Sequence, residues 1–405
     1  MPHPAVLAFI LAGGKGERLF PLTAMRSKPA VPFGGRYRIV DFVLSNLVNS
    51  RIYSIYLLVQ YKSQSLIEHV RQNWVLSPVL KEHFVAVVPP QMRMGPEWFQ
   101  GTADAVYQNL NLIQQMGPEL VIIFGADHIY RMDIRQMMDF HLENRADITV
   151  AARPVPIGEA SSFGVIGADQ SHRIKAFDEK PKKPKPMPGD PSRAYVSMGN
   201  YIFRSDYLIH ALVEGQSRKL HDFGTHIIPA AIEKKGKVYA YDFSSNVIPD
   251  TKPYEETGYW RDVGNIKYYF DTHMDMLGAG PRFDIANRFW PIYPASYTGA
   301  AAKILKGDIE NSFLSEGVYV KDAMIKNSVI RQGVIIEEGA VIENCIIMDG
   351  CVIGSGAKLR NVIMDKHNVV EKGDTIGLDP EKDRFRCHID VSGISVVPKG
   401  GMKPA

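Results

Sequence analysis

Residues 6–19 read VLAFILAGGKGERL, an apolar run that leads directly into a glycine-rich turn. The run Val6 to Leu11 has the length and apolar character of a buried strand. In the turn, the glycines within positions 13–16 let backbone amides approach a phosphate chain closely, and Lys15 and Arg18 place positive charge beside it. We therefore expect a phosphate-binding turn after a first strand. Its spacing is neither that of a P-loop nor G-x-G-x-x-G, which argues against kinases, NTPases and dehydrogenases.

An alternation of apolar runs and helical patterns continues to about residue 277. The helical stretches have apolar residues three and four apart, while the runs between them are short and continuous. This alternation predicts an α/β domain over residues 1–277, with a mostly parallel sheet and helices on both of its faces. The runs include Ile55 to Val59, Leu120 to Phe124 and Ile148 to Ala152, and the helical stretches include Asp104 to Met116 and Arg135 to Asn144.

The period changes in the last third of the chain. A stretch rich in glycine and proline, residues 278–302, is interpreted as a linker between domains. After it, aliphatic residues recur every six positions, which is typical of a parallel β-helix whose rungs bury these residues inside a prism. We therefore expect residues 303–405 to form a hexapeptide-repeat β-helix. The six-residue row consists of Val329, Ile335, Val341, Ile347, Ile353 and Leu359.

Further motifs follow the glycine turn in a fixed order. Residues 27–32 read SKPAVP and residues 33–46 read FGGRYRIVDFVLSN. The spacing from the glycine turn to Lys28 and Pro29 resembles the sugar-1-phosphate nucleotidyltransferase signature. The continuation to Asn46 resembles the glucose-1-phosphate adenylyltransferase branch, of the bacterial glycogen-synthesis type. The resemblance extends over nearly the whole chain, through segments that begin at Gln60, Gly101, Asp127, Phe163, Phe177, Ser197, Asp222 and Tyr259.

This resemblance implies a reaction and a fold. The reaction is transfer of the adenylyl group of ATP to α-D-glucose 1-phosphate, which gives ADP-glucose and pyrophosphate for glycogen synthesis. The fold is a Rossmann-like nucleotidyltransferase domain followed by a left-handed parallel β-helix. The sugar phosphate is already an anionic nucleophile, so the reaction needs alignment and charge neutralisation rather than a covalent protein intermediate. Mg²⁺ held by one or two carboxylates is expected to supply part of that charge.

Asp127 and Asp262 are the candidate metal ligands. Asp127 follows the apolar run Leu120 to Phe124, and ligands of open α/β sheets bind outside the carboxyl ends of strands. The resemblance also assigns Arg18 and Lys28, together with Asp127, to catalysis. It further implies a nucleotide-binding group of Gly13, Gly14, Gly16, Gln60, Gln91, Trp98, Phe99, Gly101 and Thr102, and a sugar-phosphate-binding group of Gly164, Glu179, Lys180 and Ser197.

Regulation and assembly also follow from the resemblance. Members of the family are commonly homotetramers, and small-molecule effectors bind them near the junction of the two domains. Met25 and Pro32 stand where some members carry lysine and histidine, so the identity of the effector is left open. The candidate activator residues are Arg26, Arg38, Arg384 and Arg386.

The bulk composition bears on the class of partner. The 405 residues carry a net charge of +3, which is too small to indicate nucleic-acid binding. The start lacks the pattern of a secretory signal, and no apolar run is long enough to cross a membrane. The three cysteines include no C-x-x-C pair, which argues against a disulfide framework and a structural zinc site. We therefore expect a cytoplasmic enzyme without nucleic-acid or membrane partners.

Three alternatives stay open at this point. A uridylyl- or thymidylyltransferase would use the same turn with another base. A non-catalytic regulatory subunit would keep the fold but lose the metal carboxylates or the phosphate-binding cations, which are present here. The hexapeptide domain could also acylate a sugar, although its repeat offers one histidine, His367, as a candidate base.

Overall fold

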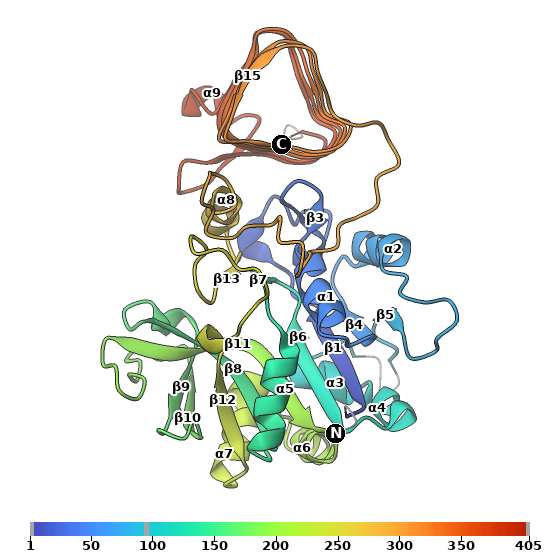
Figure 1. Cartoon of the computed structure of the whole chain (residues 1–405), viewed down its shortest axis with the longest axis vertical. Helices are drawn as coiled ribbons and strands as arrows, with labels where there is room; N and C mark the ends of the chain where they lie inside the picture. The colour runs from blue at the N-terminus through green and yellow to red at the C-terminus, as the bar shows by residue number, and fades with distance from the viewer. Residues whose placement is uncertain (1–3, 93–96, 402–405) are drawn as a thin grey trace.

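The computed structural model describes residues 4–92 and 97–401 and consists of a sheet domain and a triangular prism (Figure 1). The apolar runs of the first part form a nine-stranded sheet. Its strands are β1 (Val6–Ala12), β4 (Ser54–Val59), β5 (Phe84–Val88), β6 (Leu120–Gly125), β8 (Ile148–Pro156), β9 (Gly164–Ala168), β10 (Ile174–Glu179), β11 (Arg193–Arg204) and β12 (Val238–Asp242).

The first strand, β1, lies inside the sheet between β4 and β6. It is parallel to both, with Phe9 opposite Tyr56 on one side and Ile123 on the other. Seven of the nine strands run in the direction of β1, and β10 and β11 run against it. The predicted, mostly parallel sheet is confirmed. Residues 7–10 are fully buried, as expected for a strand covered on both faces.

Helices cover both faces of the sheet, also as predicted. Successive side chains of β1 point to opposite faces, so Ile10 packs with α1, α2 and α5 while Phe9 packs with α3, α4, α6 and α7. No helix within the described ranges is long and apolar enough to span a membrane. The helices are α1 (Val40–Asn49), α2 (Gln64–Asn73), α3 (Thr102–Tyr107), α4 (Leu110–Met116), α5 (Ile134–Glu143), α6 (Ser205–Ser217), α7 (Ile228–Glu233), α8 (Ile266–Met274) and α9 (Pro380–Asp383).

The prism is the predicted left-handed parallel β-helix. Its strands stack in parallel register from rung to rung and enclose an aliphatic core, except for β26, which runs antiparallel to β27 (Figure 1). The strands are β14 (Lys303–Ile304), β15 (Gly307–Glu310), β16 (Phe313–Leu314), β17 (Tyr319–Val320), β18 (Ala323–Lys326), β19 (Val329–Ile330), β20 (Ile335–Ile336), β21 (Ala340–Ile347), β22 (Val352–Ile353), β23 (Lys358–Met364), β24 (Val369–Val370), β25 (Thr375–Ile376), β26 (His388–Ile389) and β27 (Ser395–Val397).

The six-residue row does not point uniformly into this prism. Ile335 is 38% exposed and Val341 is half-buried, whereas their neighbours Ile336 and Ile342 are fully buried. Val341 pairs with Lys358, 17 positions later, so a rung is one residue shorter than three repeats of six. The shortened corner shifts the register, and a shift of one residue turns a side chain to the other face. The expectation of an inward row is therefore wrong at Ile335 and Val341. It is also wrong at Val329, which stacks on Ile346 of the core shared with the sheet domain, while its neighbour Ile330 lies in the prism core.

The prism packs against the sheet domain through a shared apolar core. Ile346 of β21 lies in the same cluster as Phe33, which precedes α1 in the chain. The connecting residues 278–302 bury Trp290, whose indole nitrogen donates to Asn46 Oδ1 (3.2 Å). The connection is thus fixed to α1 rather than free. The division of the chain at residues 277 and 302 stays a prediction.

Candidate functional site

The glycine turn leaves β1 and leads into a short 3-10 helix, Glu17–Leu19. Gly16 has a φ of 66°, in the left-handed region that favours glycine, and a β-carbon there would lie 2.9 Å from Cβ of Lys28. Thr23 Oγ1 donates to the Gly16 carbonyl (3.0 Å) and closes the turn. A β-carbon at Gly14 would meet no described atom within 4 Å. The turn therefore packs against Lys28 on one side and has space for a ligand over Gly14.

A separate two-stranded sheet brings the predicted metal ligands together. β7 (His128–Tyr130) pairs antiparallel with β13 (Trp260–Asp262), and Asp262 lies opposite His128. The ammonium of Lys28 donates to Asp127 Oδ2 (2.9 Å) and to Asp262 Oδ1 (2.8 Å). Three predicted residues thus form one ionic group, Lys28, Asp127 and Asp262, which we call the Lys28 cluster.

Arg18 lies beside the Lys28 cluster. A β-carbon at Gly264 would lie 3.1 Å from Arg18 Nη2 and 3.1 Å from Asp262 Oδ2, so both groups border the same point. Arg18 is exposed, unlike Lys28, whose side chain is 8% exposed. The site therefore has one buried cation that orders the carboxylates and one exposed cation that is open to an anionic ligand.

Charge pairing fixes the protonation of the Lys28 cluster. Burial by itself lowers the pKa of Lys28, but the carboxylates of Asp127 and Asp262 raise it above its ordinary value. Burial by itself raises the pKa of Asp127, yet Lys28 and His128 hold it well below its usual range. The carboxyl side chains of Asp127 and Asp262 are still 38% and 28% exposed. The cluster thus presents the ionised carboxylate of Asp127, and beside it the carboxyl group of Asp262, to solvent, where oxygen ligands can reach a divalent cation.

His128 is a possible ligand that the sequence prediction missed. Asp127, His128 and Asp262 each offer one ligand atom, and these atoms lie within 4.8 Å of one another. The imidazole Nε2 lies 3.5 Å from Asp127 Oδ1, and the ring centroid lies 4.8 Å from that of Trp260. Among the described residues, Nδ1 of His128 is buried without a hydrogen-bond partner. Its place next to Asp127 in the sequence was the available signal.

Three residues of the predicted nucleotide-binding group lie together near the glycine turn. The Phe99 amide donates to Gln60 Oε1 (2.8 Å), and Gln60 Nε2 donates to the Phe99 carbonyl (3.4 Å). A β-carbon at Gly13 would lie 3.5 Å from Cβ of Gln60. The amide of Gln60 thus fixes the segment that carries Phe99 against the turn.

Gln91 and Trp98 are less closely connected to the group formed by Gly13, Gln60 and Phe99. Both are exposed, Trp98 to 51%, and Gln91 Nε2 donates to the Pro89 carbonyl (2.9 Å). No hydrogen bond within the described ranges joins either side chain to Gln60. Their role at the nucleotide stays a prediction.

Gly101 and Thr102 contact a segment to which the sequence prediction gave no role. A β-carbon at Gly101 would lie 2.3 Å from the His221 carbonyl oxygen, so only glycine fits this close approach. The Thr102 hydroxyl donates to Asp222 Oδ2 (2.8 Å) and accepts from the Phe223 amide (3.0 Å). Thr102 therefore begins α3 and, through its hydroxyl, holds residues 221–223 in place.

The same segment reaches the predicted sugar-phosphate group. A β-carbon at Gly224 would lie 3.5 Å from Glu179 Oε2, and one at Gly164 would lie 2.9 Å from the same oxygen. Gly164 and Glu179 are also paired between β9 and β10. Residues 221–224 therefore connect the nucleotide side of the site to the sugar side. The signal for this was present, since Asp222 to Gly224 was among the family motifs.

Lys180 and Ser197 complete the sugar side. Lys180 Nζ lies 3.5 Å from Glu179 Oε1 and its side chain is 65% exposed. Ser197 Oγ accepts from the Gly199 amide (3.2 Å), and a β-carbon at Gly199 would lie 3.9 Å from the His128 ring. The turn after Ser197 thus reaches the Lys28 cluster, and the exposed ammonium of Lys180 is open to an anion.

Each of the four candidate activator arginines already forms hydrogen bonds or ion pairs within the chain. Arg26 is buried and donates with Nη1 to both carboxylate oxygens of Asp365 (3.0 Å each). Arg38 donates to the Ser65 carbonyl and hydroxyl (2.8 Å each), and burial lowers its pKa to about 10. On the prism, Arg384 pairs with Glu381 and Arg386 pairs with Asp374 (2.6 Å).

Arg331 was missed by the sequence prediction and forms a second ionic group at the junction. It donates with Nε to Asp349 (2.7 Å) and with Nη1 to the carbonyls of Phe33 (2.9 Å) and Gly34 (2.7 Å). Lys366 also pairs with Asp349 (2.5 Å). We call Arg331, Asp349 and Lys366 the junction cluster. No motif pointed to it, because its partners come from both parts of the chain.

Comparison with known proteins gives two family matches. Residues 7–278 match the nucleotidyl transferase family model, and residues 294–397 match the model described as GlmU-like, C-terminal hexapeptide. The chain is 64% identical to the glucose-1-phosphate adenylyltransferase of Thermodesulfovibrio yellowstonii over 98% of this chain and 96% of the relative. It is 47% identical to the proteins of the same name from Thermus thermophilus (98% of each chain) and Mycolicibacterium smegmatis (99% and 98%).

Proposed function

The chain belongs to the glucose-1-phosphate adenylyltransferase family, and we propose from this membership that it transfers the adenylyl group of ATP to α-D-glucose 1-phosphate. The products are ADP-glucose, for glycogen synthesis, and pyrophosphate. The observation that carries the proposal is the Lys28 cluster, which lies between the glycine turn and the sugar side of the site. Ionised carboxylates and cations at this place fit a reaction whose transition state is crowded with phosphate charge.

The reaction needs no covalent protein intermediate. A phosphate oxygen of the sugar phosphate attacks the α-phosphorus of ATP, the bond to the β-phosphate bridging oxygen breaks, and pyrophosphate leaves with that electron pair. We assign Arg18 and Lys28 to neutralising the triphosphate and the leaving pyrophosphate. Arg18 is the exposed cation, and Lys28 keeps Asp127 and Asp262 oriented. Alignment and charge neutralisation then supply the rate enhancement.

Enzymes of this family generally use a divalent metal, and the residues present fit one. The ammonium of Lys28 sits where two carboxylates converge, which is a place that selects positive charge. We propose that Asp127 and Asp262 hold Mg²⁺, with His128 at their side. When bound, the metal would supply Lewis acidity and neutralise phosphate charge.

The binding groups divide between the two substrates. We assign Gly13, Gly14 and Gly16 to the phosphates of ATP through their backbone, since Gly14 has open space above it. On the other side, we assign Lys180 to the phosphate of the sugar substrate, because its ammonium is exposed beside Glu179. The remaining nucleotide contacts are assigned to Gln60, Gln91, Trp98, Phe99, Gly101 and Thr102, and the sugar hydroxyls to Gly164, Glu179 and Ser197.

Assembly and control are part of the proposal. We propose a cytoplasmic homotetramer whose small-molecule effectors act at the contact between the sheet domain and the prism. Arg26 and Arg38 lie at or near this contact, and Arg26 bridges the two parts by binding Asp365. Since Arg26 is already neutralised, an anionic effector would have to compete with Asp365 there. Arg384 and Arg386 are the candidates on the prism itself.

The test is pyrophosphate release by the purified chain with Mg²⁺ and glucose 1-phosphate. ATP, UTP, dTTP and CTP are compared, each with and without candidate effectors. Release with ATP alone is expected. Release with another nucleotide would contradict the assignment of the base but keep the nucleotidyl-transfer chemistry. No pyrophosphate release with any of the four nucleotides would contradict catalysis and favour a regulatory subunit.

A further inference from the structure

One face of the prism carries a regular pattern of charge. The strands β15, β18, β21 and β23 stack in register, and alternate residues of each strand point outward. One outward row is acidic, basic, acidic and basic from rung to rung. The neighbouring outward row is acidic, apolar, apolar and basic. The first row consists of Glu310, Lys326, Glu343 and Arg360, and the second consists of Asp308, Met324, Val341 and Lys358.

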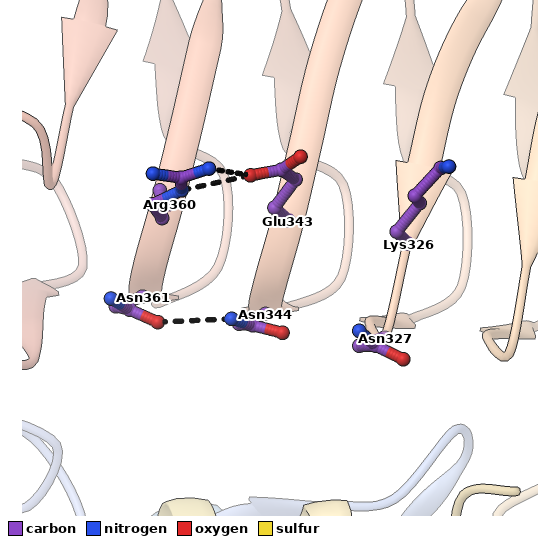
Figure 2. Close-up of a pocket in the computed structure, with 6 residues that line it drawn as sticks. All are labelled: Lys326, Asn327, Glu343, Asn344, Arg360 and Asn361. Carbon is purple, nitrogen blue, oxygen red and sulfur yellow. Dashed lines mark hydrogen bonds and ion pairs between the residues drawn. The ribbon is translucent and has the colours of Figure 1, made fainter.

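The side chains at the ends of the first row, Glu310 and Arg360, are more exposed than the central Lys326 and Glu343, and all four form ion pairs within the chain. Lys326 lies 3.2 Å from Glu310, and Arg360 contacts Glu343 (2.5 Å), as Figure 2 shows for the second pair. Lys326 also lies 3.7 Å from Asp308 of the second row. Side-chain exposure is 67% at Glu310 and 54% at Arg360. Beside the row, Lys326, Asn327, Glu343, Asn344, Arg360 and Asn361 line a shallow hollow of about 400 Å³ (Figure 2). The face is therefore a free surface of the chain with a defined charge pattern.

We propose that this face docks against the same face of a second copy of the chain, about a two-fold axis parallel to the strands. The axis lies between the second and third rungs. Such an axis reverses the order of the rungs and keeps the position along the strand. It therefore places Lys326 opposite Glu343 of the partner subunit and Glu310 opposite the partner's Arg360. All four charges of the first row then face an opposite charge.

The second row obeys the same symmetry. Asp308 faces the partner's Lys358, and Met324 faces the partner's Val341, so charge meets charge at the ends and apolar meets apolar at the centre. A two-fold interface must be self-complementary in this way, because the same patch is used twice. Both rows satisfy the condition with one axis.

The other two-fold axis that brings this face against itself gives the opposite result. An axis parallel to the prism keeps the rung and exchanges the two rows. It would place Asp308 opposite the partner's Glu310 and Lys358 opposite the partner's Arg360, which are like charges. It would also bury Met324 against the partner's Lys326. The charge pattern therefore selects the first axis and disfavours the second.

The surroundings of the face are compatible with this axis. β15 is the edge strand of its sheet, and α9 follows one rung beyond Lys358 and Arg360. The axis places α9 beyond the edge strand of the partner, where the partner's sheet has ended. The four rungs alone cover less than the roughly 800 Å² that a standard interface buries on each side. We therefore expect a salt-sensitive contact, one of those that build the proposed homo-oligomer, on which this inference rests.

The first test is the mass of the full-length assembly, measured by light scattering after size-exclusion chromatography at low and high salt. Lys326→Glu places like charges across the axis at two symmetric positions, and the dissociation constant should rise by about tenfold or more. The double variant Lys326→Glu/Glu343→Lys restores opposite charges and should recover the wild-type mass. Lys321→Glu makes the same change on another face, where Lys321 pairs with Glu337, and should leave the mass unchanged.

The double variant also separates docking from a ladder that acts only within one chain. Within the chain, the swap makes neighbours of like charge at positions 310 and 326 and at positions 343 and 360. The second substitution relieves the like pair that Lys326→Glu creates with position 343 on the next rung, but it creates a new like pair at positions 343 and 360. A purely internal ladder is therefore not restored by it, whereas docking is restored. Failure of the double variant to recover the mass would overturn the proposed surface.

A second test traps the geometry. Separately prepared Met324→Cys and Val341→Cys chains are mixed and oxidised, and a disulfide-linked heterodimer is expected because the native cysteines are buried. No heterodimer would overturn the proposed axis. A wild-type chain that is monomeric at every concentration would overturn both this surface and the homo-oligomer. Pyrophosphate release with ATP is measured on every variant and reports adenylyl transfer separately, because the face lies outside the Lys28 cluster.

Discussion

The Lys28 cluster and the junction cluster use the same chemistry for different purposes. In the junction cluster, the side chain of Arg331 is 4% exposed and that of Asp349 is 18% exposed, and Arg331 also donates to backbone carbonyls. In the Lys28 cluster the lysine is also buried, at 8% exposure, but the side chain of Asp127 is 38% exposed and its second oxygen, Oδ1, lies 3.5 Å from His128 Nε2. A closed ionic group fixes two parts of a chain to each other. An ionic group with a buried lysine and partly exposed carboxylates keeps those carboxylates oriented and accessible to a ligand.

The comparison teaches how to separate structural from functional charge. Burying an ion requires partners for each of its hydrogen-bonding groups, and a missing partner is strongly destabilising. The junction cluster meets this requirement with its own side chains and with the backbone carbonyls of Phe33 and Gly34. The Lys28 cluster leaves acceptor capacity unused, which is acceptable only where solvent or a ligand supplies the rest. Mutations in the two clusters should therefore affect different properties.

The largest effect is expected from Asp127→Asn. The variant keeps the shape of the side chain but removes the charge that would hold the metal, so turnover should fall by about 10²–10³-fold or more. The melting temperature should stay close to that of the wild type because Asp127 is part of the open cluster. Steady-state pyrophosphate release and thermal unfolding measure the two properties.

The control for this variant is Asp178→Asn, since Asp178 pairs with the exposed Lys185 at 3.2 Å and lies outside the cluster. It should retain wild-type turnover. Equal turnover of Asp127→Asn and the wild type would remove Asp127 from the mechanism, and with it the functional half of the comparison.

Arg331→Met should have the opposite effect: it should lower the stability of the fold and have little direct effect on the chemical step. It leaves Asp349 and the Phe33 and Gly34 carbonyls short of a donor, and breaking a buried pair of this kind costs about 3–5 kcal/mol of unfolding free energy. Chemical denaturation measures the change. Lys321→Met, which breaks an exposed pair with Glu337, is the control and should cost less than about 1 kcal/mol. Equal losses for the two variants would show that the junction cluster is not structural.

Lys180→Ala tests the predicted binding site for the phosphate of the sugar substrate. Loss of a charge-assisted contact to the sugar phosphate is worth about 1.5–3 kcal/mol, so the KM for glucose 1-phosphate should rise about 10–100-fold. Turnover at saturation and stability should change little, because the side chain is 65% exposed. Lys183→Ala, in the same basic stretch of sequence (residues 180–185, KPKKPK), is the matched control. A rise in the KM for ATP instead would move Lys180 to the nucleotide side.

The smallest effect is a pH dependence of stability at the junction. His273 is fully buried and accepts from the Gly34 amide (3.0 Å), and burial lowers its pKa to about 3. In the unfolded chain His273 takes up a proton near pH 6.5, whereas in the folded chain it stays neutral down to about pH 3. The free energy of unfolding therefore falls as the pH decreases from about 6.5 towards 3. This one group contributes a slope of at most about 1.4 kcal/mol per pH unit.

The variant His273→Gln should therefore lose stability less steeply than the wild type between pH 6.5 and 4. Urea denaturation at a series of pH values measures the slopes. His210→Gln makes the same substitution at a histidine whose side chain is 82% exposed and serves as the matched control. Identical slopes for the wild type and His273→Gln would exclude His273 as the source.

Much of the fold could be predicted because its signals are local. The apolar run of β1, the glycine turn and the repeat in the prism are each visible within a short window of sequence. The inward register of the prism could not be predicted, because the rung length depends on how the corners close. Ile335 and Ile336 are adjacent and equally aliphatic, and only closure of the rung decides that Ile336 is buried.

The site was predictable in its chemistry and not in its contacts. Motif order identified Lys28, Asp127 and Asp262, and the sequence also shows that Asp127 follows a strand. That one lysine binds both carboxylates, across separations of 99 and 234 residues, follows only from the pairing of β7 with β13. The role of residues 221–224 as a link between the two substrate sides also follows only from tertiary contacts, here with Thr102 and Glu179.

The sequence by itself determined the order of domains, the phosphate-binding turn and the residue types of the site, because strand length, turn conformation and side-chain chemistry are local properties. The tertiary structure alone decided which charged side chains are buried with partners from the chain and which stay accessible to a ligand. Arg26 was a candidate for an effector by its type, yet Asp365, 339 residues away, already neutralises it. Burial and partner count arise only when distant segments meet, and no local pattern contains them.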